Sequence, residues 1–169
     1  MKKTLLTILG FVMMPLVAVA QPDFSGSWVP NVGLSEPAEN ELYMYGRLDN
    51  DPVRQPDLMI EQEGDTVEVY EDSRVLTRYA IPALYVADGL ERTVTVENTG
   101  LTEQQMTSAW VDNKLVIDIV KPWGGMPGNV MLNTREEWML SPDGSKLYIT
   151  TQHNSPAKNI AYTVVYDRQ

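Results

Sequence analysis

The chain has 169 residues with 13 Lys and Arg, 23 Asp and Glu, one His and no Cys, which gives a formal net charge of −10. The lack of Cys excludes disulfides, thiol nucleophiles, Cys-ligated zinc and iron–sulfur clusters, and a single His excludes His-rich metal sites. An acidic chain is also poorly suited to nucleic acid, whose affinity for proteins comes largely from Lys and Arg that neutralise phosphates. We therefore expect no metal, no cofactor and no nucleic-acid partner.

The N-terminal residues have the pattern of a secretory signal peptide. Lys2 and Lys3 form a basic start, residues 5–17 are apolar, and residues 18–20, A-V-A, form a small-residue cleavage site. The apolar stretch is shorter than the ~20 residues that span a membrane, and no Cys follows it for a lipid anchor. We predict a signal peptide at 1–20, cleaved after Ala20, and a single domain at 21–169, periplasmic or secreted, without a transmembrane segment. An uncleaved N-terminal anchor is the alternative.

The mature chain opens with a short strand at Trp28, followed by a long segment that is rich in turn-forming residues. Within residues 30–56 the strongest strand breakers are Pro30, Pro37, Pro52 and Pro56. Ser35 is placed to cap a short helix whose apolar face is formed by Ala38, Leu42 and Tyr45. For a connection of this length, a lid over a binding site, a plug in one barrel end and a disordered linker are the three alternatives.

From residue 57 onward, short apolar alternations separated by turn residues indicate β-structure. Two strands flank a predicted turn at 63–65. A third apolar phase covers 75–81 and ends at Pro82, before a predicted break at Asp88-Gly89. The first half of the domain therefore reads as strands and turns without a long helix.

The second half of the domain repeats this pattern. Turns are predicted at 111–114 and 141–144, a long strand at 130–140 and a last strand at 160–166. Consecutive hairpins favour an all-β, up-and-down antiparallel barrel of eight to ten strands, because a closed barrel leaves no exposed edge. A barrel of this size holds side chains or one small ligand, whereas a two-sheet sandwich, the alternative, leaves no central pocket.

Residues 23–28, D-F-S-G-S-W, resemble the opening of a group of exported bacterial proteins described as lipocalin-like, calycin-type β-barrels. The motif is also similar to the G-x-W of lipocalins and the G-T-W of avidins. Further similar stretches cover much of the mature chain, at 60–65, 108–110, 114–117, 137–147 and 165–167. The resemblance implies a β-barrel that encloses an apolar small molecule. It implies no particular function, since such barrels serve transport, storage, inhibition and catalysis.

Three Trp residues share strand phases with aliphatic neighbours and are expected inside the barrel. Trp28, near the barrel floor, is expected to be purely structural, whereas Trp110 and Trp138 are expected on the cavity wall. Trp138 belongs to an alternating row within residues 130–140 that also contains Glu136. If that row points inward, Glu136 is half of an internal ion pair or a polar contact for ligand. If the strand bulges or passes the rim, Glu136 lies in water.

The loop at 122–128, P-W-G-G-M-P-G, offers an apolar tip on a flexible backbone. Trp123 and Met126 beside three Gly residues are typical of a portal to the cavity or a docking site for a protein partner. In the alternative, Trp123 folds back over the barrel mouth as a plug.

The residue types that carry acid–base or nucleophilic catalysis are missing or single. His153 follows a strand phase that ends at Thr151 and precedes turn residues, so we expect it to be a solvated loop residue. Glu136 and Glu137 are neighbours on one strand, face opposite sides and cannot pair with each other. We assign no catalytic residue, and the sequence favours a binding protein over an enzyme.

Together these patterns predict a periplasmic or secreted barrel that binds a small apolar molecule. The predicted ligand-binding residues are Tyr45, Trp110, Trp123, Glu136 and Trp138. The alternative is a non-catalytic accessory protein with a filled barrel that contacts a partner through 122–128. A hydrolase or isomerase built on a barrel scaffold is the third reading.

Overall fold

The computed structural model of the protein describes residues 21–36, 55–72, 83–97, 101–122, 131–154 and 159–169. These residues form ten β-strands and contain no helix. The strands, in chain order, are β1 Gly26–Pro30, β2 Asp57–Glu63, β3 Thr66–Asp72, β4 Ala83–Val86, β5 Asp88–Glu97, β6 Leu101–Val111, β7 Lys114–Pro122, β8 Met131–Leu140, β9 Lys146–Asn154 and β10 Asn159–Arg168. The short helix predicted over Ala38, Leu42 and Tyr45 lies outside the described residues.

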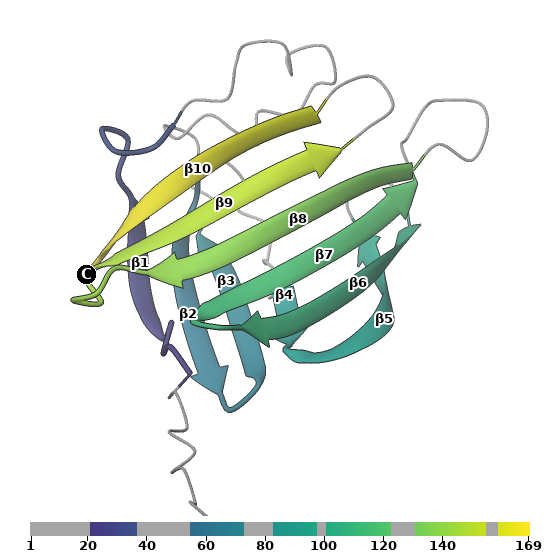
Figure 1. Ribbon diagram of the computed structural model, residues 1–169, viewed down its shortest axis with the longest axis horizontal. Helices are drawn as coiled ribbons and strands as arrows, with labels where there is room; N and C mark the ends of the chain where they lie inside the picture. The colour runs from purple at the N-terminus through teal and green to yellow at the C-terminus, as the bar shows by residue number, and fades with distance from the viewer. Residues whose placement is uncertain (1–20, 37–54, 73–82, 98–100, 123–130, 155–158) are drawn as a thin grey trace, which may run out of the picture.

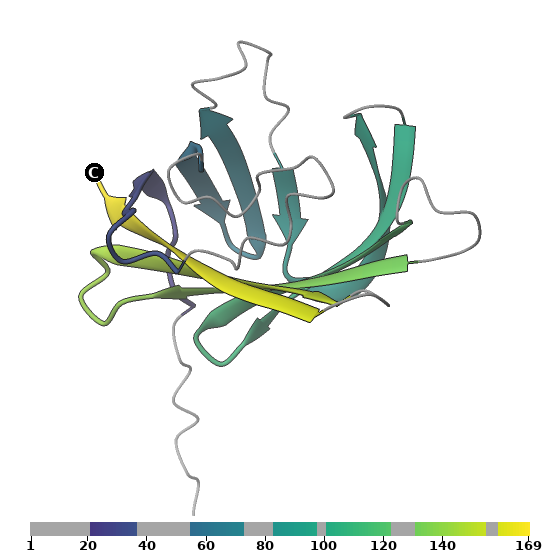
Figure 2. The same cartoon turned by 90° about the horizontal axis from the view of Figure 1, so that it is seen from above.

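All ten strands belong to one antiparallel sheet in the order β4-β3-β2-β1-β10-β9-β8-β7-β6-β5. β1 pairs with both β2 and β10, so the sheet curls round on itself (Figure 1, Figure 2). β4 and β5 are the two ends of this order, and β4 also contacts β6. The fold is a nearly closed, up-and-down antiparallel barrel of ten strands, which confirms the predicted class. The described strands do not divide into the two facing sheets of a sandwich.

Side-chain alternation places one face of each strand in the core, because successive residues of a strand point to opposite sides. In β2, Leu58 and Ile60 are buried while Met59 between them is exposed. In β9, Leu147 and Ile149 are buried at alternate positions. The apolar phases read from the sequence in these strands are therefore the phases that face the interior.

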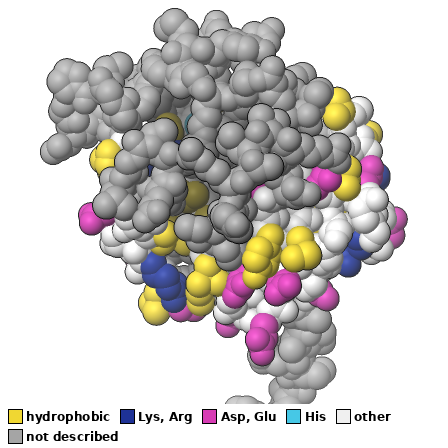
Figure 3. Space-filling model, turned by 180° about the vertical axis from the view of Figure 1, so that it is seen from behind, with side chains coloured by type: hydrophobic (Ala, Val, Ile, Leu, Met, Phe, Trp, Pro, Cys, Tyr) yellow, Lys and Arg dark blue, Asp and Glu magenta, His cyan; other side chains and the backbone are white. Residues whose placement is uncertain are grey.

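The outer face of the barrel is charged and carries ion pairs between neighbouring strands. The pairs are Lys114–Glu137, Arg135–Asp118 and Lys146–Asp167. On the described part of the opposite side, apolar and acidic side chains lie close to one another (Figure 3). The acidic net charge of the chain is thus carried largely on surfaces that water can solvate.

The hairpin turn between β8 and β9 is formed as predicted. The Gly144 amide donates to the Ser141 carbonyl at 2.9 Å, and Gly144 has a φ of 70°, a conformation that favours glycine. Hydrogen bonds from Ser141 and Ser145 lower the pKa of the Asp143 carboxyl to about 2. The turn is therefore closed by its own side chains as well as by its backbone.

The predicted break at Asp88-Gly89 is a bulge at the start of β5 rather than a turn. The β5–β6 register shifts between Asp88 and Glu91, and Gly89 has a φ of 77°. Asp88 accepts two hydrogen bonds from Arg92, at 2.6 and 2.8 Å. The chain reverses one residue earlier, at Ala87, whose amide donates to the Asp65 carbonyl at 2.7 Å. The strand predicted at 75–81 lies outside the described residues. The next described strand, β4, begins at Ala83.

Candidate functional site

Four aromatic side chains, Phe24, Trp28, Trp110 and Trp138, form a floor at the barrel end that carries the β2–β3, β4–β5, β6–β7 and β8–β9 turns. Phe24 stacks on Trp110 with ring centroids 5.8 Å apart and meets the edge of Trp138 at 6.2 Å. The Trp28 indole donates to the Phe24 carbonyl at 2.9 Å, and the Arg168 guanidinium lies 4.5 Å above the Trp28 ring. Phe24 and Trp28 are completely buried, so this end is packed and Trp28 is structural.

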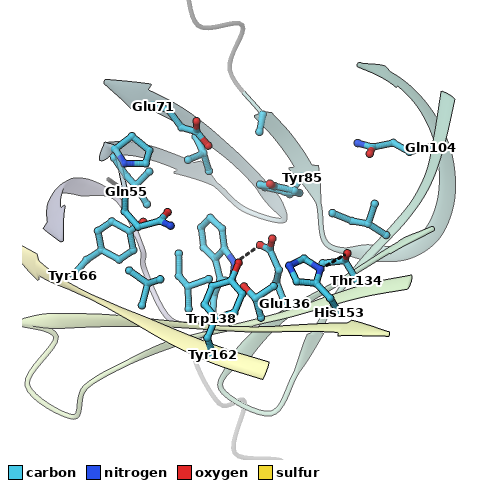
Figure 4. Close-up of a pocket in the computed structure, with 18 of the residues that line it drawn as sticks. Gln55, Glu71, Tyr85, Gln104, Thr134, Glu136, Trp138, His153, Tyr162 and Tyr166 are labelled. Carbon is cyan, nitrogen blue, oxygen red and sulfur yellow. Dashed lines mark hydrogen bonds between the residues drawn. The ribbon is translucent and has the colours of Figure 1, made fainter. Parts of the chain in front are cut away.

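A cavity of about 320 Å³ lies above this floor, between two walls of the barrel (Figure 4). Strands β2, β3 and β4 form one wall, and β6 to β10 form the other. The apolar part of the lining includes Leu58, Val69, Trp138, Ile149 and Val164. The polar part includes Glu71, Lys121, Thr134, Glu136 and His153. The interior therefore combines apolar and polar side chains in comparable measure, which suits a molecule that has both an apolar and a polar part.

Glu136 lies near the centre of the larger wall. Cross-strand pairing builds a row from β6 to β10 that runs Ser108, Ile117, Glu136, Thr151 and Tyr162. The pairing of β8 with β7 and with β9 shows no register shift, so alternation along β8 is unbroken. Glu136 consequently faces the interior of the barrel, is half-buried, and lies on a part of β8 that has no bulge.

The carboxylate of Glu136 is held by the indole of a neighbour on the same strand. Trp138 Nε1 donates to Glu136 Oε2 at 3.0 Å, and Trp138 is itself 3 % exposed (Figure 4). Burial raises the pKa of Glu136, the Trp138 hydrogen bond opposes that rise, and the Glu71 charge adds to it. Lys121 lowers the pKa with the weakest of these effects. The carboxylate is therefore an interior acceptor whose charge is only partly compensated.

Tyr85 faces this carboxylate from the opposite wall. Its ring centroid lies 5.7 Å from that of Trp138 at an interplanar angle of 68°. Burial raises the pKa of the Tyr85 phenol, and the charges of Glu136 and Glu71 raise it further. Burial likewise raises the pKa of Tyr166, which also lines the cavity. Both phenols stay protonated at neutral pH and present neutral hydroxyl groups.

His153 also lines the cavity, which corrects the expectation of a solvated loop residue. Strand β9 continues to Asn154, and His153 pairs with Thr134 of β8. The Thr134 hydroxyl and His153 Nδ1 lie 2.9 Å apart, with donor and acceptor set by the tautomer of the ring. Tyr162 lies against the other side of the imidazole, with ring centroids 5.9 Å apart. Sequence alone missed this because the register that brings Thr134 to His153 depends on strands that are separated by a turn.

The other predicted ligand-binding residues divide into three groups. Trp138 and Glu136 line the cavity together. Trp110 does not line it, which corrects its expected place on the wall: its ring is stacked under Phe24 and its Nε1 donates to Asp65 Oδ1 at 3.1 Å. Tyr45 and Trp123 lie outside the described residues, as does most of the 122–128 loop.

Several cavity residues were not singled out in the sequence. Tyr162 and Tyr166 occupy the inward phase of the last strand, so alternation in β10 could have identified them. Tyr85 had no comparable signal, because β4 has only four residues and was not predicted. Glu71 continues the inward phase of Val67 and Val69, and extension of β3 by two residues would have found it.

Neither a metal site nor a membrane-spanning helix is found in the part of the chain that the structure describes. No three His, Asp or Glu side chains in the described ranges are grouped so that they could hold a metal ion. No helix long and apolar enough to cross a membrane occurs in the same ranges.

Comparison with known proteins supports the fold rather than an identity. No protein-family model and no curated protein matches the sequence. Among solved structures, the chain is similar to zebrafish ileal bile acid-binding protein, crystallised in complex with cholic acid, with a TM-score of 0.58 and 16% sequence identity. The match covers 86% of this chain and 98% of that chain. At this identity the likeness shows that the two chains share a barrel fold.

Proposed function

We propose that this protein binds one small, largely apolar molecule inside its barrel. The observation that carries the proposal is the interior cavity of about 320 Å³, whose lining combines an apolar surface beside Trp138 with polar and charged side chains. Ligand pockets usually measure about 300 to 1,000 Å³, which puts this cavity at the small end of that range. A compact ligand fits such a space.

The similar zebrafish barrel supports the proposal, because its structure holds cholic acid, a small amphipathic molecule. The two chains share their architecture over nearly the whole of that protein. The identity of the ligand does not transfer between them, since the lining side chains decide what a barrel binds. The filled-barrel alternative is less well supported, because the described side chains leave interior space.

We also propose that the protein works in the periplasm or outside the cell, after removal of residues 1–20. The basic start, the apolar stretch and the A-V-A cleavage site support this proposal. Expression of the full chain in a bacterial host tests it: the exported protein should begin at Gln21 when its intact mass is measured. A protein that retains residues 1–20, or that stays in the cytoplasm, would contradict the proposal.

Binding inside the barrel is tested with N-phenyl-1-naphthylamine, a neutral apolar fluorescent probe. We expect saturable enhancement of its fluorescence by the mature chain, and loss of that enhancement in Thr151→Phe, which fills the cavity from β9. Gln152→Phe is the matched control, because Gln152 is exposed on the other face of the same strand. Equal binding by both variants, each shown to be folded by its thermal transition, would exclude the cavity as the site.

A protein partner at the 122–128 loop stays a prediction from the sequence. The apolar tip at Trp123 and Met126 is its only support, and those residues lie outside the described ranges. Deletion of the loop followed by capture of partners from the periplasmic fraction would test it separately from ligand binding.

A further inference from the structure

We propose that the polar end of the ligand is a hydrogen-bond donor, a hydroxyl or an amine, which binds Oε1 of Glu136, and that a ligand carboxylate is disfavoured there. This inference rests on the binding function proposed above and specifies the chemistry of its ligand. Its basis is the placement of Glu136 between the apolar floor and the polar upper part of the cavity (Figure 4).

The first support is the incomplete set of donors around Glu136. Trp138 supplies one hydrogen bond, to Oε2, and no other residue of the described ranges donates to this carboxylate. An ionised carboxylate has about four lone-pair sites, and the half-buried Glu136 turns its unpaired sites toward the cavity. Burial raises the pKa of Glu136, which means that the ionised form lacks solvation and gains from an added donor. A donor on the ligand supplies what Oε1 lacks.

The second support is the balance of charge along the lining. Among the described lining residues, Glu71 and Glu136 are acidic, Lys121 is basic, and Arg is absent. Lys121 has the weakest effect on Glu136, whereas the Glu71 charge acts in the opposite direction and more strongly. A carboxylate brought next to Glu136 would add a like charge in a poorly solvated space, where repulsion is stronger than in water. A hydroxyl meets no such repulsion, and an ammonium group is attracted.

The third support is the direction in which the lining changes from apolar to polar. The cross-strand row that includes the floor residue Trp138 also contains Ile149 and Val164. The row on the far side of Glu136 contains Thr134 and His153. An amphipathic molecule that lays its apolar body against Trp138 and Tyr85 therefore brings its polar end to Glu136.

The inference is tested with decanol, decylamine and decanoate, which share one alkyl chain and differ in their head group. Each displaces N-phenyl-1-naphthylamine from the mature chain at about pH 8, above the usual range of carboxyl pKa values. We expect decanol and decylamine to bind roughly tenfold or more tightly than decanoate, the scale of a hydrogen bond to a charged group. Tightest binding by decylamine, weakened by salt, would identify an ammonium head, and similar binding of decanol and decylamine would identify a neutral donor contact.

Glu136→Gln supplies the discriminating comparison, because the amide keeps the shape of the side chain but both donates and accepts. We expect decanoate to gain affinity in this variant, so that decanol and decylamine no longer bind much more tightly than decanoate. Glu137→Gln is the matched control, since Glu137 lies on the outer face of β8 beside Lys114 and should leave the preference unchanged. Tightest binding by decanoate, or an unchanged preference in Glu136→Gln, would overturn the inference while leaving the binding function intact. Failure of the probe and all three ligands to bind would overturn both.

Discussion

The floor and the cavity are built from the same strands with the same alternation, yet they differ in how their polar atoms are paired. In the floor, the Trp28 and Trp110 indoles both have acceptors and the rings are in mutual contact. In the cavity, Glu136 accepts one hydrogen bond from the described residues and faces the cavity. The barrel is therefore well packed at one end, whereas in its middle the hydrogen-bonding capacity of Glu136 is only partly used.

This difference indicates how a cysteine-free barrel can hold an interior space. A cavity removes packing contacts, and each lost contact costs stability. The completely buried Phe24 and Trp28, together with the buried edge of Trp138, concentrate apolar burial at one end. Substitutions in the two regions should therefore have different effects on stability and on binding.

The largest expected effect is the loss of the floor in Trp28→Ala. Truncation of a buried Trp typically costs about 3 to 5 kcal/mol, and here it also removes the hydrogen bond to Phe24. Urea unfolding monitored by circular dichroism measures the loss. If Trp28→Ala does not fold, Trp28→Phe provides a milder test with the same sign. A loss below about 1 kcal/mol would mean that the floor is not the main source of stability.

Trp138→Phe should have the next largest effect, because Trp138 belongs to both regions. The substitution removes the hydrogen bond from the indole to the Glu136 carboxylate, and a hydrogen bond to a charged group is worth about 1.5 to 3 kcal/mol. Trp110→Phe is the control, since its indole bonds to the exposed carboxylate of Asp65 and should cost less. Equal losses of unfolding free energy in the two variants would erase the distinction between floor and cavity.

Thr134→Val should have a smaller effect, confined to the polar row of the cavity. The substitution keeps the shape of the buried side chain and removes its contact with His153, at an expected cost of about 0.5 to 1.5 kcal/mol. Thr150→Val removes the comparable contact with Thr163 on the outer face. Ring-nitrogen NMR of His153 should change in Thr134→Val and stay unchanged in Thr150→Val; a change in both would argue against a local contact.

The smallest expected effect is a difference in the pH dependence of stability between Glu136→Gln and the native chain. Burial raises the folded-state pKa of Glu136 above its ordinary value of 4.5, so the folded state binds a proton more readily than the unfolded state. The contribution of Glu136 to stability therefore falls as pH rises from about 4.5 through the folded pKa. Glu71, Lys121, Tyr85 and His153 also line the cavity, and they remain in both proteins.

Glu137→Gln should show the opposite slope on the outer face. The hydrogen bond from Lys114 lowers the folded-state pKa of Glu137, so its contribution is present above the ordinary value and is lost as pH falls through the folded pKa. Urea unfolding of the three proteins between about pH 3 and pH 8 measures both slopes. Parallel curves for Glu136→Gln and Glu137→Gln would contradict the assignment of the two carboxylates to different environments.

Sequence alternation was sufficient to predict the barrel and most of its strands. The apolar phases of β2, β3 and β6 to β10 are regular, because each strand has one dry face over many residues. Alternation failed for β4, because a strand of four residues is too short to show a clear apolar phase. It also failed at Asp88-Gly89, where residues typical of a turn form a bulge instead.

The candidate site was only partly predictable for a different reason. Alternation tells which face of a strand points inward but not how far along the barrel the packing ends and the cavity begins. Trp110 and Trp138 therefore received the same prediction, although Phe24 separates Trp110 from the cavity. The contact between His153 and Thr134 and the position of Tyr85 opposite Trp138 depend on tertiary packing that no local pattern encodes.

The pairing of β1 with β10 has a consequence for the order in which the molecule assembles. Trp28 is aligned with Arg168, so the pairing that joins strands β1 to β4 to strands β5 to β10 links segments near opposite ends of the described chain. Contacts of such long sequence separation are slow to form, because a large loop must close before they are made. The hairpins from β6 to β9 need only local contacts, whereas the strand of Trp28 cannot complete its pairing until β10 is available. Ligand capture in an enclosed interior thus becomes possible only when the final strand has arrived.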